Sequence, residues 1–180
     1  MDRPAPRTLT AAAALAELRE TGRLAHAVLT EPLPIRDLGT DEVITQPIHL
    51  LDCRFPRLDG WYSTYEAPVV LERCEVGAVQ LTSTFFLAGL AIRGCTFTGL
   101  FTVECGGHNK GGAVVELSGC TFRAFANFFD CLYEGPFVAR DCAFEAGTNL
   151  LGNQGTAYSV SFATPPEITG CTGTLDVAGG

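Results

Sequence analysis

The feature of this sequence that most constrains its fold is an eight-residue segment that recurs six times. The copies read IHLLDCRF, VVLERCEV, LAIRGCTF, VELSGCTF, FVARDCAF and PEITGCTG, each with a cysteine at the sixth position. These cysteines are Cys53, Cys74, Cys95, Cys120, Cys142 and Cys171, at intervals of 21, 21, 25, 22 and 29 residues. A recurrence of this length predicts a solenoid, in which each repeat packs only against its neighbours.

The residues within each copy alternate as they would in a strand. Apolar residues stand five and three positions before the cysteine, as Ile48 and Leu50 do, and a phenylalanine or valine stands two after most cysteines. Spacing by two places these side chains on one face of an extended chain. The residue before each cysteine is Asp, Arg or Gly, at a point where the alternation slips by one. Asp and Gly favour sharp turns, so we expect a corner there.

A repeat of about 21 residues with no helical periodicity fits one coil of a parallel β-helix, whose stacked strands lie about 4.8 Å apart. Parallel crossover connections are nearly always right-handed. The predicted fold class is therefore an all-β solenoid, a right-handed parallel β-helix, with a short capping α-helix at its N-terminus. Thr10 is the expected N-cap of that helix, which runs to about Arg19 and stops at Gly22. We expect one domain, consisting of a helical cap, an irregular first coil and the regular coils, at residues 1–24, 25–47 and 48–180.

The charge of the chain limits its partners. The formal net charge is −8 and the isoelectric point is about 4.8. Proteins that grip phosphate backbones carry the opposite sign, so we expect no binding to nucleic acid or to an anionic membrane. Glu17 and Glu20 interrupt the mostly alanine run that follows Arg7, and no stretch reaches the roughly 18 apolar residues of a membrane span. We therefore expect a cytoplasmic protein.

The spacing of cysteine and phenylalanine resembles the pentapeptide-repeat proteins. A cysteine stands two residues before a phenylalanine, and Val76, Leu81 and Phe86 follow one another at intervals of five. The resemblance covers roughly residues 48 to 145. It implies a parallel β-helix. Some acidic members of that family protect type II topoisomerases by imitating DNA, so it also implies an inhibitor, immunity or target-protection role.

Six of the eight cysteines occupy one position of the repeat, next to apolar positions. Stacked thiols point in parallel directions, which suits a disulfide poorly, and a free cysteine packs as a small apolar residue. We therefore expect a row of buried, reduced thiols.

Cys105 and Cys131 depart from this position, and three interpretations of them remain open. Cys105 could be a nucleophile with His108 as its base and Asp130 beside them. Cys105, His108 and Cys131 could instead supply three ligands to zinc. The third interpretation is a flexible glycine loop, GGHNKGG, that protrudes from the stack with an incidental histidine. Lys110 in that loop lacks the following Ser or Thr of a phosphate-binding loop. No cofactor and no metal are predicted.

A second insertion, Leu151 to Pro166, contains Asn153 and Tyr158. If both insertions leave the stack at one corner, they form the walls of a groove, and Asn127 and Asn149 form its floor. A row of asparagines is also a purely structural stacking device. Trp61 belongs to an aromatic cluster that would either anchor an interface or fill the first coils. The candidate binding residues are Asn127, Asn149, Cys131, Lys110, Asn153, Tyr158 and Trp61.

The leading functional hypothesis is a non-catalytic binding protein that docks a protein partner through a lateral face or groove. The first alternative is a small enzyme acting on a saccharide or small metabolite near Cys105, His108 and Asp130. The second is a structural module that forms homo-oligomers through its C-terminal coil, which has no capping helix in the sequence. The absence of a convincing catalytic set favours the first of the three.

Overall fold

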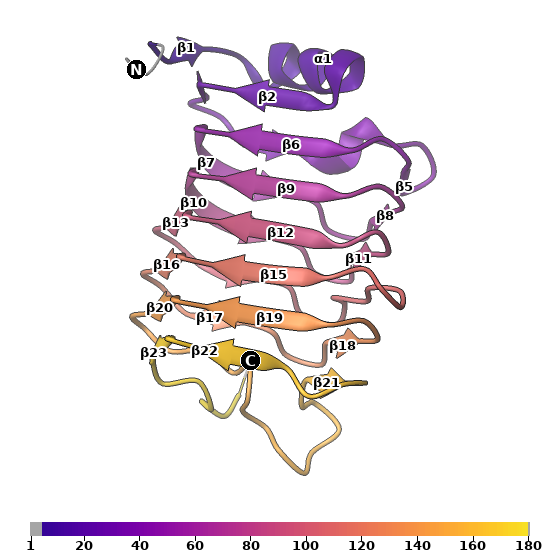
Figure 1. The fold of residues 1–180 in the computed structure, drawn as a ribbon. Coiled ribbons are helices and arrows are strands. Elements are labelled where there is room, and N and C mark those ends of the chain that lie inside the picture. Colours follow the sequence, from indigo (N-terminus) through magenta and orange to yellow (C-terminus); the bar gives the residue numbers. More distant parts are fainter. Residues whose placement is uncertain (1–4, 180) are drawn as a thin grey trace.

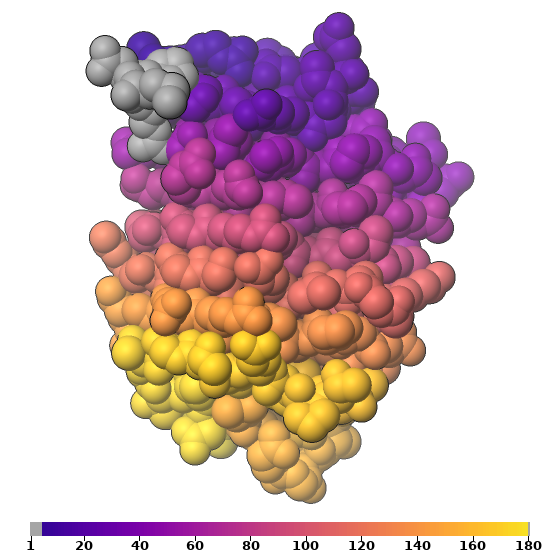
Figure 2. Space-filling view, viewed as in Figure 1, coloured from indigo at the N-terminus to yellow at the C-terminus, as the bar shows by residue number. Residues whose placement is uncertain are grey.

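The computed structural model describes residues 5–179, which form short parallel strands in stacked sheets with one α-helix at the N-terminal end (Figure 1). The broad sheet at the front of Figure 1 has seven strands. These are β2 (Arg23–Ala25), β6 (Ile48–Leu51), β9 (Val69–Glu72), β12 (Leu90–Arg93), β15 (Val115–Ser118), β19 (Phe137–Arg140) and β22 (Glu167–Thr169). Figure 2 shows the outer surface of this sheet, with the strands in sequence order from one end of the molecule to the other.

A second sheet has eleven strands. They are β1 (Arg7–Thr8), β3 (Ala27–Val28), β4 (Leu33–Pro34), β7 (Arg54–Asp59), β10 (Glu75–Gln80), β13 (Thr96–Phe97), β14 (Phe101–Thr102), β16 (Thr121–Phe122), β17 (Ala126–Asn127), β20 (Ala143–Phe144) and β23 (Thr172–Gly173). Two small sheets complete the stack. One contains β5 (Val43–Ile44), β8 (Thr64–Tyr65) and β11 (Phe85–Phe86), and the other β18 (Leu132–Tyr133) and β21 (Ser161–Phe162).

The strand register follows the sequence repeat. Val69 pairs with Ile48 on one side and with Leu90 on the other, so equivalent residues of successive repeats lie side by side. The residues that precede the six cysteines all have a left-handed backbone, with φ between 51° and 64°, as expected for a corner. The prediction of parallel, stacked repeats is confirmed, and the arrangement is compatible with a solenoid.

The interior contains the predicted rows. Five of the six repeat cysteines are at most 2% exposed, and all eight cysteines of the chain are free thiols. The Sγ–H of Cys120, for example, donates to the carbonyls of Ile92 and Ser118 at 3.3 Å. The ring of Phe122 stacks between Phe97 and Phe144, with centroid separations of 5.0 and 4.7 Å. Buried thiols and stacked rings therefore fill the space that each repeat encloses.

The N-terminal cap forms as predicted. Helix α1 (Ala11–Thr21) begins after Thr10, whose Oγ1 accepts a hydrogen bond from the Ala13 N–H at 3.2 Å. It ends at Gly22, which has a φ of 68°. The next segment is more regular than predicted, because β2 pairs with β6, and Ala27 is fully buried in register with the cysteine row. Because alanine stands where the later repeats have cysteine, the sequence pattern did not reveal this repeat. The short 3₁₀ helix η1 (Ile35–Leu38) and the turns around it interrupt the strands of this segment.

The last residues of the described chain cover part of the C-terminal end. Leu151 N–H donates to the Leu175 carbonyl at 2.8 Å, and Val177 N–H donates to the Thr148 carbonyl at 3.1 Å. Pro166 precedes the edge strand β22 and is equivalent in register to Val115, two repeats earlier. The N–H of Val115 donates to the Pro136 carbonyl in the following repeat. Proline has no N–H, so this edge offers one donor fewer to an added strand.

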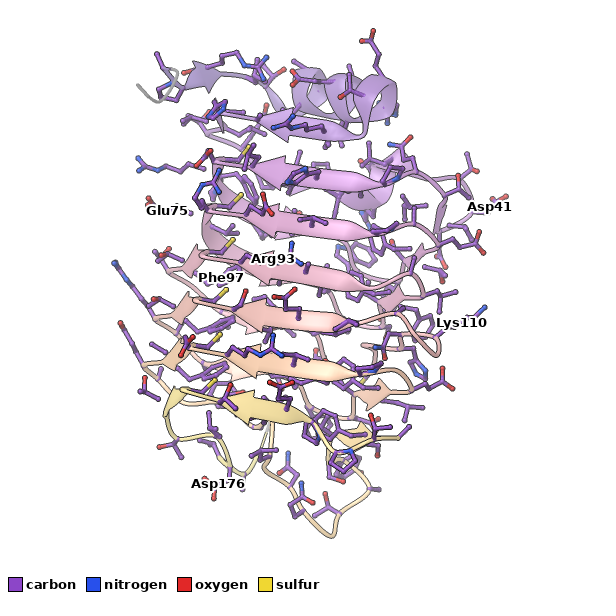
Figure 3. The ribbon with its side chains drawn as sticks, viewed as in Figure 1. Asp41, Glu75, Arg93, Phe97, Lys110 and Asp176 are labelled. Atoms are coloured by element: carbon purple, nitrogen blue, oxygen red, sulfur yellow. The ribbon has the colours of Figure 1, made fainter. Side chains whose placement is uncertain are left out.

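Ion pairs connect neighbouring strands on the outer surface of the seven-stranded sheet. Arg93, labelled in Figure 3, donates to Glu116 at 2.6 Å and lies 3.5 Å from Glu72. The hydrogen bond from Arg93 lowers the pKa of the Glu116 carboxyl. A carboxyl whose pKa is lowered on folding stabilises the protein above its unfolded pKa of about 4.3, and the contribution disappears as the pH falls through the folded pKa.

Glu116→Gln is therefore expected to lower the free energy of unfolding by about 0.5 kcal/mol at pH 7 and to have no effect near pH 3. Urea denaturation of both proteins at the two pH values measures the difference. Glu145→Gln is the control, because Glu145 is exposed and forms no ion pair with a described residue. If Glu116→Gln still has a lower free energy of unfolding than the native protein at pH 3, its loss of stability does not come from the Arg93–Glu116 ion pair.

Candidate functional site

The outward side chains of four neighbouring strands form a continuous surface, here called the lateral polar face. Strands β7, β10, β14 and β17 pair in register, so that Asp59, Gln80, Thr102 and Asn127 form one row. The same register places Trp61, Thr82, Glu104 and Phe129 in a second row two residues further along each repeat. The intervening side chains, such as Leu58 and Val79, are buried in the core. The alternation with a period of two thus separates this face from the interior.

Hydrogen bonds connect the side chains of the lateral polar face to one another. Glu104 accepts from Thr82 Oγ1 at 3.2 Å and from Asn127 Nδ2 at 2.9 Å. Asn149 Nδ2 donates to Asn127 Oδ1 at 2.7 Å, and Asn149 Oδ1 accepts from the Phe128 N–H at 2.6 Å. Asn127 and Asn149 are 8% and 1% exposed. These two asparagines therefore order the face from beneath, as a structural row, and do not form the floor of an open groove.

Aromatic pairs lie at both ends of the lateral polar face. The rings of Trp61 and Tyr62 meet edge to face, with centroids 5.2 Å apart and an interplanar angle of 79°. At the other end Phe129 stacks on Tyr158 with a centroid separation of 4.9 Å. Tyr62 and Tyr158 are 53% and 55% exposed. Together with Asn127, two further predicted binding residues, Trp61 and Tyr158, are therefore on this face.

The surface is hollowed on two sides of the Trp61–Tyr62 pair. One depression of about 260 Å³ is lined by Trp61, Tyr62, Gln80 and Thr82. A second, of about 180 Å³, is lined by Arg36, Asp37, Glu42, Trp61, Tyr62 and Ser63. The two aromatic rings thus form a ridge between two shallow pockets with polar walls.

The surroundings of the three proposed catalytic residues do not match a catalytic role. Cys105 and Asp130 occupy the left-handed corner of successive repeats, with φ of 55° and 54°. Partial desolvation, and the charges of Asp130 and Glu104, raise the pKa of the Cys105 thiol. His108 contacts the ring of Phe85 edge to face, and its Nδ1 lies 4.0 Å from Glu134. No hydrogen bond or ion pair joins Cys105, His108 and Asp130 within residues 5–179. A raised pKa opposes formation of a nucleophilic thiolate.

Cys131 does not share a surface with Cys105. Leu132 N–H donates to the Gly106 carbonyl, so Cys131 is in register with Gly106 and points inward. It is 1% exposed, its Sγ–H donates to the Val103 carbonyl at 2.8 Å, and burial raises its pKa to about 12. The interpretation that groups Cys105 and Cys131 as zinc ligands is therefore wrong, because Cys131 is one residue out of alternation with Cys105. In the described chain no three His, Cys, Asp or Glu side chains are grouped so as to hold a metal ion.

The glycine-rich insertion is anchored to the stack and does not protrude as a whole. Asn109 is fully buried, and its Nδ2 donates to the Ala113 carbonyl at 2.7 Å. Its Oδ1 accepts from the Gly135 N–H at 3.0 Å. Lys110 projects from the edge of the molecule, as Figure 3 shows. The buried Asn109 side chain therefore fixes a loop that we expected to be flexible from the glycine content of the loop.

The second insertion also contacts the chain itself. Asn153 Oδ1 accepts from the Gly179 N–H at 2.8 Å, and Asn149 Nδ2 donates to the Gly179 carbonyl at 2.8 Å. These predicted binding residues therefore hold the C-terminal segment in place. Sequence reasoning missed Arg36 and Gln80. Gln80 stands 21 residues, or one repeat, after Asp59, so the repeat spacing could have shown that both residues belong to one row.

Comparison of the chain with protein-family models, with curated proteins and with solved structures finds no match. Among the described residues no helix has the length and apolar character needed to cross a membrane. The geometry and charge of the lateral polar face are therefore the features that bear on function.

Proposed function

We propose that this chain is a right-handed parallel β-helix protein without catalytic activity, and that its lateral polar face docks a protein partner. The observation that carries the proposal is the hydrogen-bonded order of that face. Glu104 is fixed by both Thr82 and Asn127, and Asn127 is fixed by Asn149. Side chains that are already ordered lose little conformational entropy on binding, which favours recognition of a matching surface.

The aromatic pairs support the same proposal. Tyrosine and tryptophan are enriched among the residues that contribute most binding energy at protein interfaces. Trp61 and Tyr62 at one end, and Tyr158 at the other, are the aromatic anchors of this face. The net charge of −8 favours a partner with a basic surface. An inhibitor, immunity or target-protection role of the kind found among pentapeptide-repeat proteins fits such a surface.

Two alternatives receive less support. An enzyme acting near Cys105, His108 and Asp130 would need an activated thiol, whereas the pKa of Cys105 is raised. Assembly through the C-terminal repeat would need an open edge. The backbone hydrogen bonds of the C-terminal segment and the missing N–H of Pro166 disfavour strand addition there.

A photo-crosslinking amino acid at position 80 tests the proposal. Gln80 is exposed on the lateral polar face, whereas Ala91 is directed outward on β12, in the seven-stranded sheet, and serves as the matched control position. After expression in the native host, we expect one dominant crosslinked protein from position 80 and none from position 91. Substituting Tyr62 with serine should reduce its yield several-fold. Equal crosslinking from both positions, or none from position 80, would refute docking on this face.

A further inference from the structure

We propose that the 180 Å³ depression beside Trp61 and Tyr62 binds the guanidinium group of an arginine side chain supplied by the partner. This inference rests on the proposed docking function and names the chemistry of the partner. Three features of the depression carry it, namely its aromatic walls, the guanidinium already present and the surplus of carboxylates.

The aromatic walls have the geometry of a cation-binding corner. The two rings are nearly perpendicular, with an interplanar angle of 79° and centroids 5.2 Å apart. A cation beside them can therefore contact a ring face, which is the negative side of the aromatic quadrupole. Ring faces attract cations through the aromatic quadrupole, most strongly for tryptophan, and arginine is the commonest protein cation in such contacts. Tyr62 is 53% exposed, so its ring is open to a partner.

The chain itself places one guanidinium at this corner. The Cζ atom of Arg36 lies 3.7 Å from the centroid of the Trp61 ring. Its Nε is 3.6 Å from Asp37 Oδ1, beyond hydrogen-bond distance, and makes no hydrogen bond to a described residue. Arg36 therefore shows that the Trp61 ring accepts a guanidinium. The Tyr62 side chain is 53% exposed, and Glu42 forms no ion pair among residues 5–179.

Carboxylates outnumber cations around the depression. Asp37 and Glu42 line it together with Arg36, so the lining carries one negative charge in excess. Asp41 precedes Glu42 in the chain and projects outward in Figure 3; it carries a further negative charge but does not line the depression. Neither Asp41 nor Glu42 forms an ion pair with any residue in the described ranges. A carboxylate at the rim can pair with a guanidinium held on an aromatic ring, which selects arginine over neutral side chains.

The single tryptophan of the chain reports directly on this site. The experiment titrates the full-length protein with Nα-acetyl-arginine amide and records Trp61 fluorescence, with Nα-acetyl-citrulline amide as the uncharged control of equal shape. We expect a saturable change with the arginine compound alone, and weaker binding at high ionic strength.

Two variants assign the response to the depression. Tyr62→Ser introduces the residue that the next repeat has at this corner, Ser83, and Glu42→Gln removes one charge at constant shape. Each is expected to weaken binding of the arginine compound about fivefold. Glu116→Gln, on the seven-stranded sheet, is the matched control and should leave it unchanged. Equal responses to arginine and citrulline, or unaltered binding in both variants, would overturn the proposal.

The failure of this inference and of the docking proposal can be told apart. If position 80 crosslinks a partner while the arginine compound leaves Trp61 fluorescence unchanged, the lateral polar face docks a protein and the arginine site is wrong. If the arginine compound binds and position 80 crosslinks nothing, the docking proposal fails and the cation site remains. When both succeed, arginine-to-alanine substitutions in the captured partner should include one that weakens the complex at least about fivefold.

Discussion

Replacing Phe122 with alanine is expected to lower the free energy of unfolding by about 4 kcal/mol. The side chain is fully buried and stacks between Phe97 at 5.0 Å and Phe144 at 4.7 Å, with Phe101 meeting it edge to face at 5.0 Å. Its removal leaves a cavity whose walls are aromatic rings fixed by their own strands. Domains of this size have total stabilities of about 5–15 kcal/mol, so the variant should lose between about a quarter and most of its stability.

Urea denaturation followed by far-ultraviolet circular dichroism measures this loss. The matched control is Phe125→Ala, because Phe125 is only half-buried and precedes β17 on the outer surface. We expect a loss of about 1 kcal/mol or less for the control. Similar losses for Phe122 and Phe125 would mean that Phe122 is not in a stacked interior row.

Asn149→Leu is expected to cost about 3 kcal/mol, because it removes several buried hydrogen bonds at once. Its amide donates to Asn127 and to the Gly179 carbonyl, and its carbonyl oxygen accepts from the Phe128 N–H. Leucine has nearly the same size but leaves the Phe128 N–H without a partner in the interior. It also releases one attachment of the C-terminal segment.

Two measurements check the Asn149 prediction. Denaturation gives the free energy, with Gln80→Leu as the control on the same face, which should change stability by no more than about 0.5 kcal/mol. Hydrogen exchange should show faster exchange of the Val177 amide, whose N–H donates to Thr148, in Asn149→Leu than in the native protein. A variant as stable as Gln80→Leu would remove the basis for a structural asparagine row.

The repeat could be predicted from the sequence because the same side chains recur at the same interior positions. Cys74 and Cys95 are buried in adjacent repeats for the reason that the pattern suggested, since a thiol fits a small apolar space. Gly94 and Asp141 have the left-handed backbone that their residue types favour. The N-cap at Thr10 and the stop at Gly22 were predictable for similar local reasons. Each of these predictions depends on a residue and its immediate neighbours.

The errors arose where the partner of a side chain is distant in the sequence. The direction of Cys131 depends on its register with Gly106, and a shift of one residue turns an outward thiol inward. Asn109 is buried because the Ala113 carbonyl and the Gly135 N–H lie beside it, which glycine content cannot indicate. The contact between Arg36 and Trp61 joins two repeats across an irregular segment. Such contacts depend on three-dimensional register.

The central claim is that the recurring cysteines form an interior row from which the lateral polar face takes its register. Thiol labelling of the native protein with iodoacetamide, read residue by residue by mass spectrometry, tests it most directly. At a pH high enough to ionise Cys105, whose thiol pKa is raised, we predict that exposed Cys105 is modified first and half-buried Cys171 more slowly, while the other six thiols stay protected until urea unfolds the chain. Native labelling of Cys74, Cys95 or Cys120 at the rate of Cys105 would contradict the stacked arrangement and the face built on it.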